Sequence, residues 1–378
     1  MRGLKIKRDE WITYGLDVIH DRLFREATLP QTNVDVAFLA NSFASPRMTT
    51  MFEPLDAWQK ERPIEAFSDF FPEMVNNNVF NGRLYGMPMR ATNMVLLYNQ
   101  QILAERGITR PPRTVEEFLD VARRCTFTRP SGEKVYGFVG YGTRSEIFYS
   151  LICLARAWDG DFVTRDFKVV INEPPVVNAL TLLRQMFAEG IAPPNLTDFS
   201  VPDVIRAMQT GIGAMLPAPI SYSFPINDAR QSKVAGNVKA TRLPLSRELA
   251  GRLEGNPGVT EFWSFVIPKG ATNKELSWAV VRYFSSRLAT LQMALNGNSS
   301  TRTSTYAETA YKAESPDADT EAAALKSART PWPSFENVQK AIDALGVACH
   351  EAVLGRKAPK QALDETARTI EGLLPKNR

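Results

Sequence analysis

The sequence contains few of the residues that catalytic and metal sites use most often. Among 378 residues there are two histidines, His20 and His350, so the commonest general base and metal ligand is nearly absent. No GK[ST] phosphate loop and no Gly-x-Ser-x-Gly nucleophile turn occurs. His20 stands beside Asp21 in a predicted amphipathic helix, and we interpret it as a partly exposed surface residue. We therefore expect no catalytic residues, no metal site, no cofactor and no enzymatic activity.

Cysteine, charge of one sign and long apolar runs are also scarce. Cys125, Cys153 and Cys349 are widely spaced and form no Cys-x-x-Cys pair, which argues against a disulfide framework. The formal charge is +4, from 45 basic and 41 acidic residues, and there is no long basic run, so nucleic-acid binding has little support. No apolar stretch approaches the roughly 20 residues of a membrane-spanning helix.

The sequence does have the length of a two-domain protein and the alternating strand and helix patterns of an α/β fold. A chain of 378 residues exceeds what one hydrophobic core usually organises, so two domains are expected. Strand-like runs alternate with helical patterns, which favours an α/β architecture with largely parallel sheets. The clearest strand candidates are VDVAFLA (34–40), MVLLY (94–98) and FWSFVI (262–267).

Several helices are marked by caps and apolar stripes. Thr114 and Glu117 form a capping-box pattern, in which each side chain satisfies a backbone donor of the other, so a helix is predicted to begin there. An apolar stripe over 176–187 ends shortly before a glycine, as a helix with a glycine cap does. Two further stripes, over 338–353 and 363–374, predict that the carboxy-terminal fifth of the chain is helical.

Polar side chains interrupt two apolar runs in the segment NGRLYGMPMRATNMVLLYN (81–99). Arg90, Thr92 and Asn93 each need water or a hydrogen-bonding partner. The segment is either an ordinary polar loop between two strands, or a place where the chain crosses between two lobes and turns polar groups toward a ligand.

Aromatic residues stand beside small polar ones in predicted loops and strand ends, at Phe148, Tyr149, Tyr222, Trp263 and Trp332. A sugar ring presents an apolar face of C–H groups, on which an aromatic ring packs, and a rim of hydroxyls, which Asn, Asp, Glu and Arg bind. Each of these rings could instead belong to a core. Trp332 is the best candidate for a ligand-binding ring, because a proline on each side places it in a loop.

Eight motifs follow one another in the order seen in family 1 extracellular solute-binding proteins. They are VDVAFLA, EPLDAW, NGRLYGMPM, LLYNQQILAERGI, PRTVEEFLDVARR, GIGAML, WSFVIPKGATNKELSWAVVRYFSS and GRKAPKQALDETARTIEGLL. From about Leu4 onward, the chain thus resembles these carbohydrate receptors of bacterial ABC importers, the family of maltose-binding protein. The resemblance implies a type II periplasmic-binding-protein-like fold, with two α/β lobes, hinge strands and a helical C-terminal region.

The resemblance also implies that each lobe is discontinuous in sequence. Lobe 1 would comprise residues 1–91 and 262–302, and lobe 2 would comprise residues 92–261 and 303–378. The chain would cross between them near Ala91, Glu261 and Thr303. The polar segment described above would then be the first hinge, beside the space between the lobes.

A ligand held between the lobes is a further implication of the resemblance. The residues at the matching positions are Asn41, Ser42, Arg90, Phe148, Tyr222, Trp263, Arg302 and Trp332. The implied function is to capture a carbohydrate, either an oligosaccharide or a glycoside, and to deliver it to the permease subunits of the importer. The implied state is a monomer in the periplasm or at the extracellular cell surface.

The start of the chain departs from the family pattern. Members begin with a signal or lipoprotein peptide and a first strand-helix unit, whereas MRGLKIKRDEWITYGL lacks the apolar segment of about 7–15 residues that a secretory signal contains. We expect that this unit is missing and that adding it would stabilise the chain, because its strand would pair with neighbouring backbone groups. Alternatively, Leu4–Ile6 and the following helix already complete the first lobe.

Two other functions fit parts of the sequence. The same fold could bind a polyamine, a phosphodiester or another small polar solute. Arg90 and Arg302 would pair with an anion, whereas a cation would need Glu146 or Glu261. A chain without a secretory signal could also be an intracellular α/β enzyme, which the scarcity of histidine and of catalytic motifs disfavours.

Overall fold

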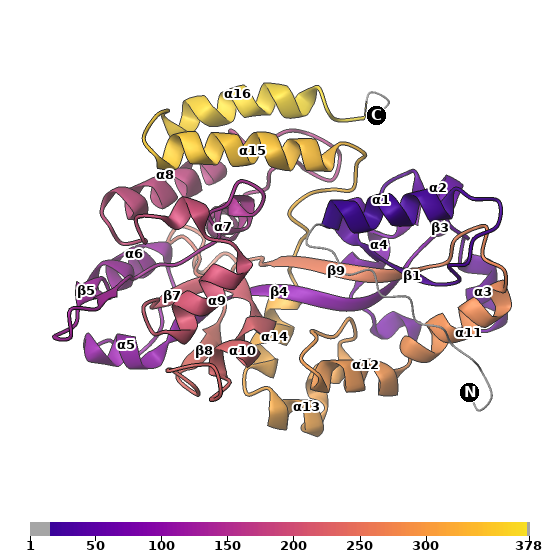
Figure 1. Ribbon diagram of the computed structural model, residues 1–378, viewed down its shortest axis with the longest axis horizontal. Helices are drawn as coiled ribbons and strands as arrows, with labels where there is room; N and C mark the ends of the chain where they lie inside the picture. Colours follow the sequence, from indigo (N-terminus) through magenta and orange to yellow (C-terminus); the bar gives the residue numbers. More distant parts are fainter. Residues whose placement is uncertain (1–15, 376–378) are drawn as a thin grey trace.

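Two long antiparallel strands, β4 (Met87–Asn99) and β9 (Val259–Val266), run through both halves of the molecule (Figure 1). The computed structural model describes residues 16–375. We call β4 and β9 the central ribbon; they pair from Met87 opposite Phe265 to Met94 opposite Val259. On one side, β1 (Ala37–Ala40) adds to β9, and on the other, β7 (Met215–Pro219) and β8 (Val238–Thr241) add to the far end of β4. The central ribbon therefore belongs to both lobes.

The strand candidates of the sequence are confirmed, but the expected direction of pairing is wrong. The runs 34–40, 94–98 and 262–267 contribute to β1, β4 and β9. Every ladder between the named strands of residues 16–375 is antiparallel. β1 pairs with β9, more than 200 residues later, and not with its neighbour in the chain. Alternation of strand and helix patterns predicts the fold class without fixing which strands meet.

Lobe 1 combines the amino-terminal segment with the segment that follows β9. Its elements are α1 (Leu16–Ala27), α2 (Met48–Met51), α3 (Asp56–Glu61), α4 (Pro72–Asn76), β2 (Val79–Phe80), β3 (Arg83–Leu84), α11 (Lys274–Phe284) and α12 (Arg287–Leu295). Asn81 and Gly82, which have positive φ values of 51° and 73°, join β2 to β3 in the two-residue turn that an Asn-Gly pair favours. The expected strand at Leu4–Ile6 lies outside the described residues.

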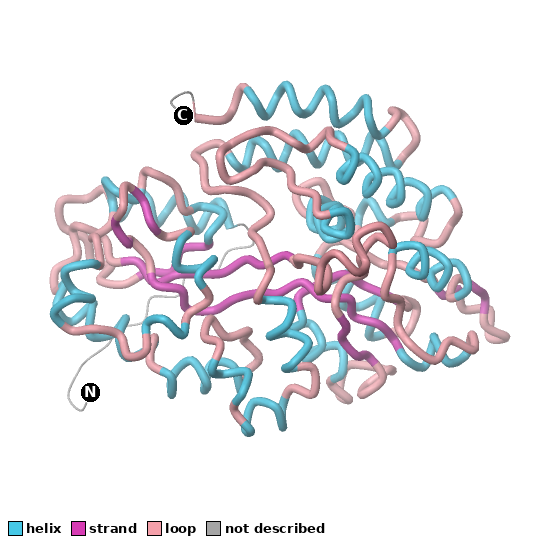
Figure 2. The backbone as a smooth tube through the Cα atoms, turned by 180° about the vertical axis from the view of Figure 1, so that it is seen from behind, coloured by secondary structure: helices cyan, strands magenta, loops and turns pink. Residues whose placement is uncertain are grey.

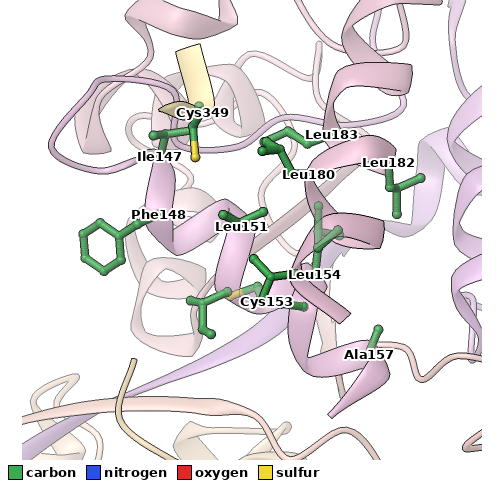
Figure 3. Close-up of a cluster of buried hydrophobic side chains, with 14 of the residues drawn as sticks. Ile147, Phe148, Leu151, Cys153, Leu154, Ala157, Leu180, Leu182, Leu183 and Cys349 are labelled. Atoms are coloured by element: carbon green, nitrogen blue, oxygen red, sulfur yellow. The ribbon is translucent and has the colours of Figure 1, made fainter. Parts of the chain in front are cut away.

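Lobe 2 contains the longest helices, α8, α15 and α16. Its elements are α5 (Gln100–Glu105), α6 (Val115–Arg124), β5 (Phe127–Thr128), β6 (Lys134–Val135), α7 (Ile147–Ala155), α8 (Pro174–Ala188), α9 (Val201–Gln209), α10 (Ser223–Asn227), α15 (Val338–Val353) and α16 (Pro359–Glu371). The predicted stripes form α8, α15 and α16, and Thr114 caps α6 by accepting from the Glu117 N–H at 3.2 Å. In Figure 3, Ile147 and Leu151 of α7 lie near Leu180 and Leu183 of α8 and near Cys349 of α15. No helix within residues 16–375 is long and apolar enough to cross a bilayer.

A third passage of the chain between the lobes wraps around one face of the central ribbon. After α12, Ser299 pairs with Ala91 of β4; the chain then forms α13 (Thr309–Glu314) and α14 (Ala318–Leu325), and Arg329 pairs with Val259 of β9. Figure 2 shows the loop before α15 rising across the ribbon. Phe262 packs in a core that includes residues of these helices. The passage therefore extends from residue 299 to residue 329 and includes Thr303.

Arg302 is buried within lobe 1 and holds several of its loops together, which contradicts its expected contact with a ligand. Its side chain is 0% exposed and lies over the Phe70 ring at 4.0 Å. The guanidinium donates to the backbone oxygens of Ser285, Ala66 and Glu65 at 2.6–3.1 Å and pairs with Asp69 at 3.3 Å. These bonds join three separate loops of the lobe.

We predict that Arg302→Ala lowers the free energy of unfolding by about 3–5 kcal/mol, because it removes the cation paired with Asp69 and a donor from several buried carbonyl oxygens. Urea denaturation measures the change. Arg287→Ala is the matched control, since Arg287 approaches the same Asp69 carboxylate at 3.9 Å with 59% of its side chain exposed; it should cost less than about 1 kcal/mol. Unchanged stability in Arg302→Ala, with reduced ligand affinity, would restore the binding role that the sequence suggested.

Candidate functional site

One face of the central ribbon presents polar and aromatic side chains. Arg90 of β4 lies opposite Trp263 of β9, and Thr92 lies opposite Glu261. Directly opposed residues of an antiparallel pair share a face, and so do residues two apart on one strand. All four side chains are half-buried, whereas the opposed pair Ala91 and Phe262 turns to the face that α13 and α14 cover. Polar groups on the first face are thus within reach of solvent and of a ligand.

Lobe 2 adds two tyrosines to this face. Tyr149, on the first turn of α7, donates from its hydroxyl to Glu261 Oε2 at 2.5 Å. Tyr222 ends a short 3-10 turn that follows β7, and it lies close enough to Arg90 for their charges to interact. The Arg90 guanidinium lies 5.4 Å from the centre of the Trp263 ring. We call Arg90, Tyr149, Tyr222, Glu261 and Trp263 the ribbon cluster.

On the lobe 1 side, Trp263 lies near His20, which we expected at the surface from the sequence. His20 is 0% exposed, stacks on Phe43 at 3.9 Å and lies 5.5 Å from the Trp263 ring. Its Nε2 accepts from the Ala40 N–H at 3.0 Å, so it is not the surface residue that we expected. The position three residues later in α1 is Leu23, which is also buried. The spacing of His20 and Leu23 therefore places both on the buried face of the helix, although the charged Asp21 beside His20 suggested an exposed position.

Asn41 and Ser42 lie beside the cluster without joining it. Both belong to the 3-10 turn Asn41–Phe43 that follows β1. Asn41 is 5% exposed, and its Oδ1 accepts from the Phe262 N–H at 2.9 Å, which fixes the turn to the edge of β9. Ser42 is half-buried in the same turn. The turn positions Phe43 under His20 and so supports Trp263 indirectly.

Phe148 and Trp332 belong to the core of lobe 2, contrary to their expected positions at the ligand. They are 3% and 4% exposed, and the Trp332 ring packs on Phe162 at 4.9 Å. Figure 3 places Phe148 among the buried side chains. Tyr149, the next residue of α7, reaches Glu261 instead, and its ring lies 4.0 Å from that of Phe148. Of the eight predicted residues, the structure brings Arg90, Tyr222 and Trp263 together.

Burial perturbs the ionisation of the ribbon cluster. It raises the pKa of Glu261 to about 7, although the hydroxyl of Tyr149 partly offsets this by donating to the carboxylate. Burial also lowers the pKa of Arg90 and raises that of Tyr222. The pKa of Tyr149 is raised well above its usual value by burial and then by the charge of Glu261. A carboxyl group that titrates near neutral pH is typical of a functional site.

A separate groove of about 510 Å³ also lies between the lobes, but its charges are already paired. Its walls are residues 73–80 of lobe 1, residues 161–167 of lobe 2 and the loop 329–334. Arg165 pairs with Glu73 across it, and Arg329 pairs with Asp161 at 3.1 Å. No residue of the ribbon cluster lines this groove. We therefore take the ribbon cluster, with its unpaired and perturbed groups, as the candidate site.

The site offers ring faces, one strong donor and one strong acceptor. Trp263, Tyr149 and Tyr222 supply the rings, Arg90 the donor and Glu261 the acceptor. The described residues contain no group of three or more His, Cys, Asp or Glu side chains arranged to hold a metal ion. The arrangement is suited to holding a polar ligand that has apolar faces.

Comparison with known proteins identifies relatives of the chain and of its fold. Residues 29–287 match the family model described as bacterial extracellular solute-binding protein. The galactooligosaccharide-binding protein of Bacillus subtilis (strain 168) is 23% identical over 79% of this chain and 68% of its own length. Maltose-bound MalE3 of T. maritima superposes with a TM-score of 0.80, at 23% identity, over 94% of this chain and 88% of its own. A ribitol complex of an ABC transporter solute-binding protein from Agrobacterium radiobacter K84 gives a TM-score of 0.78 at 21% identity, covering 95% and 90%.

We predict that Glu261→Gln stabilises the unliganded protein, relative to wild type, more at about pH 8 than at about pH 5. The pKa of Glu261 is about 7 in the folded protein and near 4.5 ordinarily, so its stabilising contribution is complete below the lower value. That contribution is lost as pH rises through about 7, because charging a buried carboxylate favours the unfolded chain. Melting temperatures of both proteins across this range measure the difference.

The exposed Glu254 supplies the control for this titration. Glu254→Gln should shift the melting temperature by the same small amount at every pH. A difference between Glu261→Gln and wild type that stays constant, or shrinks as pH rises, would contradict the raised pKa.

Proposed function

Because this chain belongs to the bacterial extracellular solute-binding protein family, we propose that it binds a carbohydrate at the ribbon cluster and delivers it to the permease of an ABC importer. It acts as a receptor and not as an enzyme. The observation that carries the proposal is the convergence of Arg90, Glu261 and Trp263 from the central ribbon with Tyr149 and Tyr222 from lobe 2. This site is therefore built from both halves of the protein.

The chemistry of the ribbon cluster supports a carbohydrate. Trp263 and the two tyrosines offer faces for the C–H groups of a sugar ring, while Arg90 donates to hydroxyl oxygens and Glu261 accepts from hydroxyl groups. The ligands named for similar proteins, maltose, ribitol and a galactooligosaccharide, all combine C–H faces with many hydroxyls. A sugar or sugar alcohol is the ligand class that meets both requirements.

Closure of the lobes is the proposed mechanism of capture. The lobes share β4 and β9, so a small rotation about the ribbon changes the distance between Trp263, which contacts His20 of α1, and Tyr149 of α7. A ligand that touches both sides binds the closed form better, and this differential affinity shifts the population toward closure. The closed form then docks on the permease as a monomer, in the periplasm or at the cell surface.

We propose lobe boundaries that agree with the same arrangement. Lobe 1 comprises residues up to 91 together with 262–302, and lobe 2 comprises residues 92–261 together with the carboxy-terminal segment. Residues 303–328 lie along the covered face of the ribbon, where Asn93 Nδ2 donates to the Glu321 backbone oxygen at 3.1 Å and the Ala240 N–H donates to Asp317. We propose that this segment moves with lobe 2 during closure, since both bonds hold it to the lobe 2 half of the sheet.

We predict that Trp263→Ala weakens carbohydrate binding by about 1–3 kcal/mol, as loss of an aromatic anchor does, while the melting temperature of the unliganded protein changes little. Titration calorimetry with the tightest binder from a panel that includes maltose and ribitol measures the affinity. Trp332→Ala is the matched control, since that ring is in the core: it should lower the melting temperature and leave the affinity of the folded protein unchanged. Equal affinities of Trp263→Ala and wild type would remove the ribbon cluster from the binding site.

A further inference from the structure

Glu261 carries a carboxyl group that no basic side chain of the described residues neutralises. It lies on β9, half-buried, and its one hydrogen bond comes from the hydroxyl of Tyr149. Arg90, the basic member of the ribbon cluster, lies against Trp263 and Tyr222 instead. Elsewhere in the described chain the buried guanidinium groups are matched, as Arg302 is by Asp69 and Arg156 by Asp161. The carboxylate of Glu261 is therefore a negative charge that a cationic group of a ligand could neutralise.

A second carboxylate lies close to the same tyrosines. Glu146 precedes α7 by one residue, and its Oε2 accepts from Thr143 Oγ1 at 3.1 Å. After burial, the charges of Glu261 and Glu146 raise the pKa of Tyr149 and that of Tyr222. The charge of Arg90 acts on Tyr222 in the opposite direction. Of these groups, Glu261 is the one that accepts a hydrogen bond from a tyrosine of the ribbon cluster.

A third tyrosine, Tyr141, lies behind Tyr149 and Tyr222. Tyr141 is 1% exposed, and its ring lies 5.5 Å from that of Tyr149. Its hydroxyl interacts with that of Tyr222. Tyr141 therefore supports the two rings that face the carboxylate of Glu261.

We infer that the carbohydrate bound by the ribbon cluster carries a cationic amine, which pairs with Glu261 and packs against the rings of Tyr149 and Tyr222. The inference rests on the proposed function and narrows its ligand class to amino sugars and amino polyols. An ammonium group donates charge-assisted hydrogen bonds to a carboxylate and is attracted to aromatic faces. Hydroxyls at the other end of the ligand would face Arg90 and Trp263. A neutral sugar would leave the charge of Glu261 without compensation when the lobes exclude water.

The test compares ligands that differ in one group. Three pairs serve as probes: sorbitol and 1-amino-1-deoxysorbitol, glucose and glucosamine, and cellobiose and its 2,2′-diamino counterpart. Titration calorimetry at neutral pH should show at least one amine binding about 10–100-fold more tightly than its hydroxyl partner, as expected of an added charge-assisted contact. Because the amine binds the ionised form of Glu261, repeating the titration in buffers with different heats of ionisation should show proton release on binding.

Variants separate the role of Glu261 from general damage to the fold. Glu261→Gln should bring the affinities of the two members of a pair together, since an amide cannot neutralise an ammonium group. The exposed Glu254→Gln variant should retain the wild-type ratio. Proton release by the wild-type protein tests the same contact even if Glu261→Gln fails to fold.

The outcomes distinguish the inference from the function on which it rests. Neutral members that bind as tightly as the amines, or more tightly, would overturn the inference and leave carbohydrate capture standing. An amine preference that survives in folded Glu261→Gln would also overturn it. If no member of any pair binds, both the inference and the proposed function are contradicted.

Discussion

The antiparallel pairing of β4 with β9 is the interaction on which the rest of the structure depends. Because each strand extends into both lobes, the ladder fixes how far the lobes can separate while leaving them free to rotate about it. The alternation of side chains along a strand then divides the ribbon into two faces with different roles. One face buries Ala91 and Phe262 beneath the third passage of the chain, and the other presents Arg90, Glu261 and Trp263.

Much of the fold could be predicted from the sequence, because its strongest signals are local. Apolar runs marked three strands, and helical stripes marked α8, α15 and α16. Arg90 and Thr92, which the sequence left as part of a loop or of a crossing between lobes, lie within one continuous strand, β4. Long-range pairing was not predictable in this way: β1 joins β9 across more than 200 residues, and the direction of that ladder leaves no trace in either segment alone.

The candidate site was harder to predict, because adjacent residues can differ in their tertiary partners even where their rings are in contact. Phe148 and Tyr149 are adjacent aromatic residues, yet one packs in the core and the other bonds to Glu261. The flanking prolines placed Trp332 in a loop, but loop residues can still turn inward, as this ring does toward Phe162. Arg302 was expected to bind a ligand, but its guanidinium donates to backbone oxygens within lobe 1. Side-chain direction depends on tertiary contacts that composition and spacing do not record.

Two acids without basic partners lie on opposite faces of the ribbon. Glu261 is on the open face, and Glu321 is 0% exposed beneath the covered face, where Tyr311 donates to it at 2.8 Å. Burial raises the pKa of both carboxyl groups, and in each case a tyrosine hydroxyl stabilises the charged form. The difference is exposure: Glu321 of α14 is fully buried against the ribbon, whereas Glu261 is half-buried on the opposite face. Exposure of the side chain, and not its charge alone, therefore distinguishes a carboxyl group with a structural role from one that can bind a ligand.

The most direct measurement is a crystal structure of the protein with its tightest carbohydrate ligand. This account predicts ligand density on the open face of the ribbon, with a ring against Trp263 and polar contacts to Arg90 and Glu261. Density in the groove walled by residues 73–80 and 161–167, with the ribbon cluster empty, would contradict it.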